Sequence, residues 1–278
     1  MSTADLAKQA GMSEAQWKEA IKFDSTDRGW IIMSIGMAIG AGIVFLPVQV
    51  GLVGVWVFLL SALIAYPSIY LLQRLFINTL ADSPDCNDYP SIIGGYLGKN
   101  WGFFLGILYF MMSLICVFMY STALTNDSAS FLQSFGVTKG LLSDNPLYGL
   151  AVICFMVVVA SRGEQLLFKV STLMVLTKLC VVACLGLLMV QSWDLANLGA
   201  FPDWSYILKQ TIIMLPYTLT SIIFIPCLSP MVISYRSHHT SIHVARYKAM
   251  RAMKIAFFVL FITVFSYAMS FNLAMGHE

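Results

Sequence analysis

Long apolar stretches, separated by short polar connections, make up most of this sequence. A helix needs roughly 20 mostly apolar residues to cross the hydrocarbon core of a bilayer, which is about 30 Å thick. Seven stretches come near that length, the fourth being the shortest: 29–50, 52–75, 101–125, 145–161, 170–191, 210–235 and 254–275. The pattern predicts an all-α membrane protein with about seven transmembrane helices.

A polar segment of mixed charge, residues 1–28, precedes the first apolar stretch and is predicted to be cytoplasmic. Within it, Ser13 is followed three positions later by Gln16, which is the pattern of a helix capping box. The sequence therefore predicts a short surface helix from Ser13 to Phe23. No apolar core stands before a cleavage site here, so a secretory signal peptide is not expected.

The composition agrees with a protein embedded in a membrane. Hydrophobic residues make up 59% of the 278 residues and charged residues only 11%, whereas a soluble domain carries about a quarter charged residues. The formal net charge of +2 is too small to suggest binding to nucleic acid. The lipid bilayer is therefore the expected partner of most of the surface, and no cofactor is expected.

The positions of lysine and arginine predict the orientation in the membrane. If the N-terminus is inside the cell, thirteen of the 16 basic residues fall on the cytoplasmic side: Lys8, Lys18, Lys22, Arg28, Arg74, Lys99, Arg162, Lys169, Arg236, Arg246, Lys248, Arg251 and Lys254. Lys139 and Lys209 fall outside, and Lys178 lies within a span. The positive-inside rule thus predicts a cytoplasmic N-terminus and, with seven spans, a C-terminus outside.

The first and sixth apolar stretches contain residues that disfavour a continuous helix. Gly40–Gly42 and then Pro47 interrupt the first, and the sixth contains Pro216, Pro226 and Pro230. Glycine costs about 1 kcal/mol and proline about 3 kcal/mol in a helix interior. At membrane depth, non-helical backbone is tolerated only where it lines a cavity or is buried in protein. Both spans are predicted to unwind around a site, although close helix packing explains either pattern equally well when taken alone.

The two interrupted spans lie five spans apart, so they cross the bilayer in opposite directions. Such a pair is typical of inverted-repeat transporters, which bind substrate near the midplane. Amides freed near Gly40–Gly42 would bind a carboxylate, and carbonyls freed near Phe224–Ser229 would bind an ammonium group. The candidate substrate-binding residues are Ala38, Gly40, Ala41, Gly42, Ile43, Ser221, Phe224 and Ser229.

Three motifs resemble those of a known transporter family. The run AIGAGIVFLP (Ala38 to Pro47), the RGEQ of Arg162 to Gln165 and the pair Ser229-Pro230 resemble the hydroxy/aromatic amino acid permeases, in particular the serine/threonine branch. The resemblance implies the LeuT-type fold of the amino acid–polyamine–organocation superfamily and transport of a small neutral amino acid. The serine branch tends to carry Asn-His before Ser-Pro, where this chain has Cys227-Leu228, so the exact amino acid stays open.

The family has more spans than the seven predicted here. The resemblance therefore implies a first five-helix repeat at residues 29–191 and the start of a second repeat at residues 192–278, cut off after its second helix. A truncated fragment of such a permease, without transport of its own, is an open alternative.

Lys178, in the run VLTKLCVVAC, is the one charged residue near the middle of a predicted span. A charge at that depth costs at least about 2.5–3.5 kcal/mol on insertion scales, so it suggests a function. Burial favours the uncharged form of a lysine and would let it release a proton. We therefore predict that Lys178 carries a coupling proton, H+, in preference to snorkelling toward the interface.

Together with the resemblance, these features predict a secondary active transporter of a bacterial inner membrane. It would import a serine- or threonine-like amino acid by proton symport, with alternating access around the two broken helices. An enzyme is not expected, because no predicted span holds a carboxylate or a histidine for acid–base catalysis. A seven-helix receptor with retinal on Lys178 is disfavoured by the cytoplasmic N-terminus. Zinc binding by His239 and His243 is disfavoured because no carboxylate or cysteine lies near them in the sequence.

Overall fold

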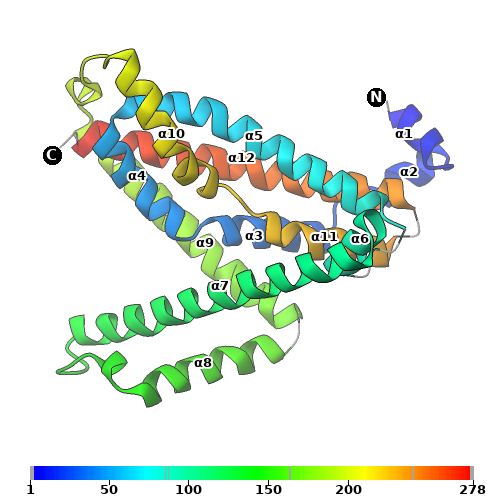
Figure 1. Cartoon of the computed structure of the whole chain (residues 1–278), viewed down its shortest axis with the longest axis horizontal. Helices are drawn as coiled ribbons and strands as arrows, with labels where there is room; N and C mark the ends of the chain where they lie inside the picture. The colour runs from blue at the N-terminus through cyan, green and yellow to red at the C-terminus, as the bar shows by residue number, and fades with distance from the viewer. Residues whose placement is uncertain (1–2, 85, 87, 163, 240, 276–278) are drawn as a thin grey trace. The chain divides into compact units, whose positions relative to one another are not determined.

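The computed structural model describes residues 3–84, 86, 88–162, 164–239 and 241–275, without the side chains of residues 41, 42, 44, 45 and 164–168. Every regular element in this part of the chain is a helix (Figure 1). The chain divides into two compact units, one formed by Met1–Asp88 with Ser171–Glu278 and the other by Tyr89–Val170. The first unit contains both interrupted spans.

Two short helices, α1 (Thr3–Gln9) and α2 (Glu14–Ala20), form a hairpin before the first apolar stretch. The predicted capping box is present: the Gln16 amide donates to the Ser13 hydroxyl, and the Ser13 amide donates to the Gln16 side chain. The helix predicted to begin after Ser13 is therefore confirmed. It ends at Ala20, slightly before the predicted Phe23.

The first apolar stretch is divided into two helices, α3 (Ser25–Ala38) and α4 (Ala41–Val53), and the second forms α5 (Val55–Asp82). Asp24 caps α3 in a second capping box with Asp27. Gly54 has a φ of +94° and makes the turn between α4 and α5, a conformation that residues with a Cβ rarely adopt.

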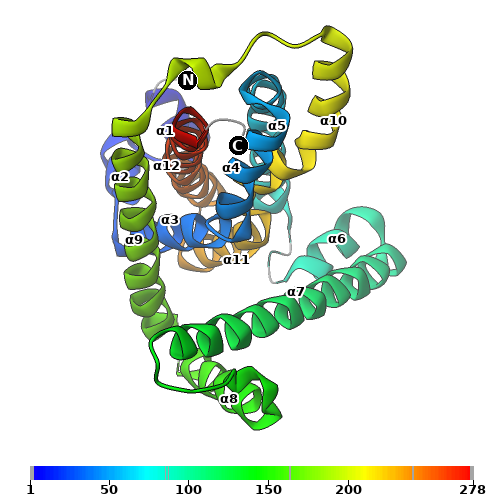
Figure 2. The same cartoon turned by 90° about the vertical axis from the view of Figure 1, so that its left-hand side faces the viewer.

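The later apolar stretches form α9 (Glu164–Met189), α10 (Trp204–Thr220), α11 (Ile225–His238) and α12 (Ile242–Met275). Short 3-10 turns, Val190–Ser192 and Leu195–Leu198, lie between α9 and α10. α12 packs against α3, α4, α5 and α11 (Figure 2). Its buried residues recur every three or four positions, which is the spacing of one helix face: Ala245, Ala249, Ala252, Ala256, Leu260 and Val264.

Aromatic rings join α5 to α12 along their shared length. The pairs Phe58–Phe265, Tyr66–Phe261 and Tyr70–Phe257 have ring centroids 5.7, 5.4 and 5.3 Å apart. Residue numbers rise along α5 as they fall along α12, so the two helices are antiparallel. Ring pairs at such distances stabilise packing beyond the area that they bury.

The second unit consists of α6 (Tyr89–Leu97), α7 (Lys99–Ser134) and α8 (Pro146–Ser161), with a 3-10 turn at Leu142–Asp144. α6 and α7 touch at glycine: a Cβ on Gly102 would lie 2.9 Å from the Gly94 Cα. The Tyr148 hydroxyl of α8 donates to the Ser128 hydroxyl of α7 over 2.8 Å. Close contact at glycine and a part-buried hydrogen bond thus contribute to the packing of this unit.

Five helical stretches in the described part of the chain are long and apolar enough to cross a membrane: Val55–Asp82, Lys99–Ser134, Lys169–Ser192, Trp204–His238 and Ile242–Met275. α8 is apolar but has only 16 residues, and the first predicted span is two helices of 14 and 13 residues. The all-α membrane protein is thereby confirmed. The count of seven spans, the LeuT-type fold and the repeat boundary at residue 191 stay predictions.

Candidate functional site

The first interruption separates α3 from α4 at Ile39 and Gly40. The Gly40 amide donates to the Ala38 carbonyl over 2.8 Å, so the backbone turns tightly here and leaves the helical ladder. α4 then begins at Ala41 without a side-chain cap. The Ile43 amide donates to the Gly40 carbonyl over 3.3 Å, but first-turn amides otherwise have no carbonyl partner within their own helix, so this end of α4 offers donors to an anion. The break lies beside its predicted position, Gly40–Gly42.

The second interruption covers Ser221–Phe224, between α10 and α11. The predicted break, Phe224–Ser229, is too late in the chain, because residues 225–229 are already helical. Pro226 lies in the first turn of α11, where proline gives up no intrahelical hydrogen bond. The carbonyls that the break exposes therefore belong to the end of α10 and to the linking residues.

The four half-helices pack in two pairs, α3 with α11 and α4 with α10 (Figure 1). The Ser34 hydroxyl of α3 donates to the Cys227 sulfur of α11 over 3.7 Å, and both residues are buried. Ser34 lies one turn before the end of α3, and Cys227 lies in the first turn of α11. This contact therefore joins the two half-helices near both breaks.

Most of the predicted site residues are buried at these breaks. At most 6% of the surface is exposed for each of Ala38, Ile43, Ser221, Phe224 and Ser229. Gly40 is half-buried, and the surroundings of the Ala41 and Gly42 side-chain positions lie outside the described residues. The Ser221 hydroxyl donates to the Thr218 carbonyl over 2.7 Å, so it is satisfied within its own turn.

Polar side chains of α5 approach the second break, and the sequence pattern did not single them out. The Ser61 and Thr218 hydroxyls lie 2.8 Å apart, linking α5 to α10. Gln73 is fully buried, and its amide nitrogen lies 3.5 Å from the Ile222 carbonyl within the break. A buried glutamine in an otherwise apolar span is the signal that could have pointed to this contact.

Lys178 lies on α9 with an exposed side chain, and no carboxylate in the described part of the chain forms an ion pair with it. One turn earlier, Val175 is buried against α3: a Cβ on Gly36 would lie 2.4 Å from Val175 Cγ2. Only glycine allows this close approach of α9 to α3. Lys178 is therefore near the first half-helix without being enclosed by it.

A buried ionic network lies where α3 begins, far from the breaks. Asp27 and Lys248 expose only 1% and 2% of their side chains and lie 3.6 Å apart. Lys248 also pairs with Asp24 at 2.5 Å, and Arg251 donates to Asp27 at 2.8 Å. The Tyr235 hydroxyl donates to the other Asp27 oxygen over 2.7 Å. Two carboxylates and two cations meet here, so their formal charges cancel; Asp27 and Lys248 are buried, whereas Asp24 and Arg251 keep 45% and 22% of their side chains exposed.

Two members of this network, Lys248 and Arg251, lie before the predicted span 254–275, yet they are part of a helix. Both belong to α12, which begins at Ile242. Their partners lie more than 200 positions earlier in the chain, so no local pattern connects them. Arg236 and Arg246 brace the same end of the bundle, by a hydrogen bond to the Ala81 carbonyl and an ion pair with Asp82.

The surroundings at this end of the bundle shift the pKa values of Asp24 and His239, which both lie outside the membrane-spanning segments. Partial burial opposes ionisation of Asp24, but the hydrogen bond and charge of Lys248 prevail and lower its pKa from 3.8. Burial and the nearby Lys248 lower the pKa of His239 from 6.5. Among the described residues, no three His, Cys, Asp or Glu side chains gather where they could hold a metal ion.

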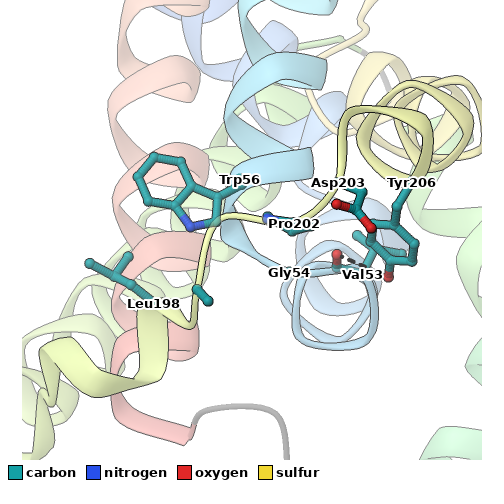
Figure 3. A pocket seen from close by; sticks show the side chains of 8 residues that line it. Val53, Gly54, Trp56, Leu198, Pro202, Asp203 and Tyr206 are labelled. Atoms are coloured by element: carbon teal, nitrogen blue, oxygen red, sulfur yellow. Dashed lines mark hydrogen bonds between the residues drawn. The ribbon is translucent and has the colours of Figure 1, made fainter.

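A separate cavity of about 420 Å³ lies at the turn between α4 and α5 (Figure 3). It is lined by Val53, Gly54, Trp56, Leu198, Ala200, Pro202, Asp203 and Tyr206. The Tyr206 hydroxyl donates to the Val53 carbonyl over 3.4 Å and ties the start of α10 to this turn. Asp203 supplies the only charge in the lining, so this cavity has no cationic side chain to match the carboxylate of an amino acid.

Comparison with known proteins finds relatives that are named as transporters. The chain is 69% identical over 272 residues to a protein of Escherichia coli K12 named "Probable serine transporter", covering 98% of this chain and 61% of that protein. It is 27% identical over 188 residues to the E. coli serine transporter SdaC, covering 67% and 42% of the two chains. A threonine/serine transporter, TdcC of Yersinia enterocolitica, is 25% identical over 174 residues, covering 61% and 38%.

The chain thus spans about three fifths of the length of its 69%-identical relative. No family model matches it, and no solved structure matches it. The relatives are named as transporters, in agreement with the expectation that the chain is not an enzyme. The sequence resemblance is confirmed, and the chain belongs with the serine/threonine transporter-like permeases.

Proposed function

We propose that this chain forms part of a secondary active transporter that imports a small neutral amino acid of the serine/threonine type. The observation that carries the proposal is the packing of two interrupted helices as two pairs of half-helices, with both breaks near the Ser34–Cys227 contact. Irregular backbone at membrane depth is tolerated only where it lines a cavity or is buried in protein, so the two breaks mark a candidate site inside the bundle. The naming of the relatives as serine and threonine transporters supports the choice of substrate.

The two breaks offer complementary chemistry to a zwitterion. The uncapped start of α4, at Gly40–Gly42, would donate amides to the substrate carboxylate. The break after α10, at Ser221–Phe224, would present carbonyls to the ammonium group. Ala38, Ile43 and Phe224 would limit the size of the substrate side chain, while Ser229 is one turn into α11 and would act from farther away.

Alternating access would move α3 away from α11 and the rest of the bundle, in an inverted-repeat fold of the LeuT type. The proposed setting is a bacterial inner membrane with seven spans and a cytoplasmic N-terminus. The apolar helices and the charge count support that setting. Lys178 is proposed to carry the coupling proton, since α9 touches α3 one turn away at Val175 and Gly36.

Binding of labelled serine to the purified chain in lipid nanodiscs tests this proposal. Gly42→Leu should abolish binding, because it adds a bulky side chain in the first turn of α4, where the proposed carboxylate donors lie. Gly186→Leu, on α9 where a Cβ would meet nothing within 4 Å, is the matched control and should bind as the unmodified chain does. Equal binding by both variants would place the substrate elsewhere.

The second candidate is a fragment that binds substrate without transporting it, which the 61% coverage of the relative favours. Uptake into proteoliposomes separates the two. If the chain transports serine by itself, serine should accumulate inside the proteoliposomes against its gradient. Binding without accumulation identifies a partial transporter. We expect this result, because the additional residues of the longer relatives would supply part of the wall of the site.

A further inference from the structure

The α1–α2 hairpin is anchored to the bundle through one large side chain. Trp17 is 1% exposed and packs with Ala7 and Val244, surrounded by partly buried apolar residues. Its ring meets Tyr247 of α12 edge-on, with centroids 5.7 Å apart and planes at 71°. A tryptophan buried this completely has lost nearly all contact with water, so the hairpin is held by Trp17 and not merely by its tether to α3.

Arg251 connects this anchor to the start of α3. Its guanidinium lies 5.8 Å from the Tyr247 ring centroid and 5.3 Å from that of Phe23. One of its nitrogens donates to the Ile21 carbonyl over 2.6 Å, directly after α2. Another donates to Asp27 over 2.8 Å. The same side chain therefore contacts the ring against which Trp17 packs, the segment after the hairpin, and the first turn of α3.

The first turn of α3 is in turn attached to α11. Asp27 is fully buried and accepts the Tyr235 hydroxyl, so α3 cannot leave α11 without exposing or unpairing a carboxylate. At the other end of the same interface, the Ser34 hydroxyl bonds to Cys227. Separation of α3 from α11 would bring the buried Cys227 thiol into contact with water.

We propose that the α1–α2 hairpin is a clasp that keeps α3 closed on α11, and that undocking of Trp17 releases this half-helix for opening. Contacts run without a gap from Trp17 through Tyr247 and Arg251 to Asp27 and Tyr235. The hairpin is built from two short helices that precede the spans, and its buried residues form a cluster with Val244, so it can detach without unfolding the spans. The inference rests on the proposed function, in which α3 moves to admit substrate.

Reactivity of Cys227 measures this opening directly. In a chain whose other five cysteines are replaced by alanine, a small water-soluble maleimide should label Cys227 slowly. Trp17→Ala should raise the labelling rate by about tenfold or more, since loss of a buried tryptophan exceeds the energy of a tenfold change in population. Trp101→Ala, at a tryptophan that is 56% exposed on α7, is the matched control and should leave the rate unchanged.

A second variant tests whether the hairpin acts through the ionic network. Arg251→Met should also raise the labelling rate, and the double variant should react no faster than the faster single variant, because both act on one path. Multiplication of the two effects would show independent actions and overturn the clasp. Hydrogen exchange of residues 3–20 reports whether the hairpin is docked. If Trp17→Ala releases the hairpin but leaves the reactivity of Cys227 unchanged, the clasp is overturned. It is also overturned if the hairpin stays docked in Trp17→Ala.

Failure of the clasp and failure of the proposed function give different results. If substrate binds at the breaks, serine should protect Cys227 from the maleimide in both the unmodified and the Trp17→Ala chains. Protection by serine without an effect of Trp17→Ala leaves the function standing and refutes the clasp. Acceleration by Trp17→Ala without protection by serine supports the clasp and counts against amino acid binding at this site.

Discussion

The Tyr235 hydroxyl donates a 2.7 Å hydrogen bond to Asp27, although the two residues are 208 positions apart in the sequence. Asp27 lies in the first turn of α3 and Tyr235 in the last turn of α11. Their bond therefore joins the ends of these half-helices that lie away from the breaks. Because Ser34 meets Cys227 near the breaks, the interface between α3 and α11 is held at both ends.

Substitution of Tyr235 and substitution of Asp27 should both destabilise the fold, but by different amounts. Tyr235→Phe deletes one hydrogen bond to a buried acceptor and should lower the free energy of unfolding by about 1–3 kcal/mol. Asp27→Asn leaves Lys248 and Arg251 without their shared carboxylate and should cost about 3–5 kcal/mol. Unfolding of the purified chain in mixed micelles measures both.

Glu19→Gln is the control for these substitutions. Glu19 pairs with Lys22 at 3.6 Å, but both side chains are more than 70% exposed, and exposed pairs contribute little. It should leave the unfolding free energy unchanged. A loss from Asp27→Asn no larger than that from Glu19→Gln would show that the buried network adds nothing to stability.

Stability should fall as the solution is acidified from neutral pH, because of His239. Its pKa is lowered from 6.5 in the folded chain by burial and by Lys248. The unfolded chain therefore binds more protons near pH 6, so stability is fully present above about pH 6.5 and declines as the pH falls through the lowered folded pKa. Asp24, whose pKa is lowered from 3.8, acts in the same direction only in stronger acid.

Thermal unfolding between about pH 7.5 and pH 5 checks this expectation. His239→Gln should flatten the decline, while His243→Gln, in the same histidine-rich segment, is the matched control. Identical pH profiles for the unmodified chain and His239→Gln would assign the decline to another group.

Local sequence chemistry predicted the first break well and the second only approximately. Glycine disfavours a helix wherever it stands, so Gly40–Gly42 marks an interruption beside the observed one at Ile39 and Gly40. Proline acts according to its position. The first turn of α11 accommodates Pro226. The break therefore lies before Pro226, earlier in the chain than the prolines of this span suggest.

The ionic network could not be predicted from the sequence, because its partners come from opposite ends of the chain. Lys248 and Arg251 contribute to the charge count in the same way whether they are solvated or buried. Their burial depends on the docking of α12 against α3, which no local pattern reports. The contact of Gln73 with the second break could not be predicted for the same reason, because its partner Ile222 lies 149 positions away in the sequence.

The predicted orientation can be tested at two connections between helices. A reporter that is active only in the cytoplasm should work when inserted after Gly98, between α6 and α7, and fail after Gly140, between α7 and α8. The charge count predicts this, since Arg74 and Lys99 flank the segment between the second and third predicted spans, and Lys139 is one of two basic residues placed outside. A periplasm-specific reporter at the same two sites should give the opposite pattern. Reversal of both results would invert the topology.

Lys178 offers the sharpest test of proton coupling, in the chain extended by the additional length of its 69%-identical relative. Lys178→Met should keep serine affinity within about threefold, since the lysine lies on α9 and not at either break. It should abolish accumulation driven by a pH gradient, because methionine cannot carry a proton.

Lys169→Met is the matched control, because Lys169 is an exposed lysine near the start of the same helix. It should accumulate serine normally. The structure leaves Lys178 exposed one turn from the Val175–Gly36 contact, so any enclosure of its charge must come from the additional length or from movement of α3. Normal accumulation by Lys178→Met with unchanged pH dependence would show that the lysine is structural, and that the coupling group must be sought elsewhere in the extended chain.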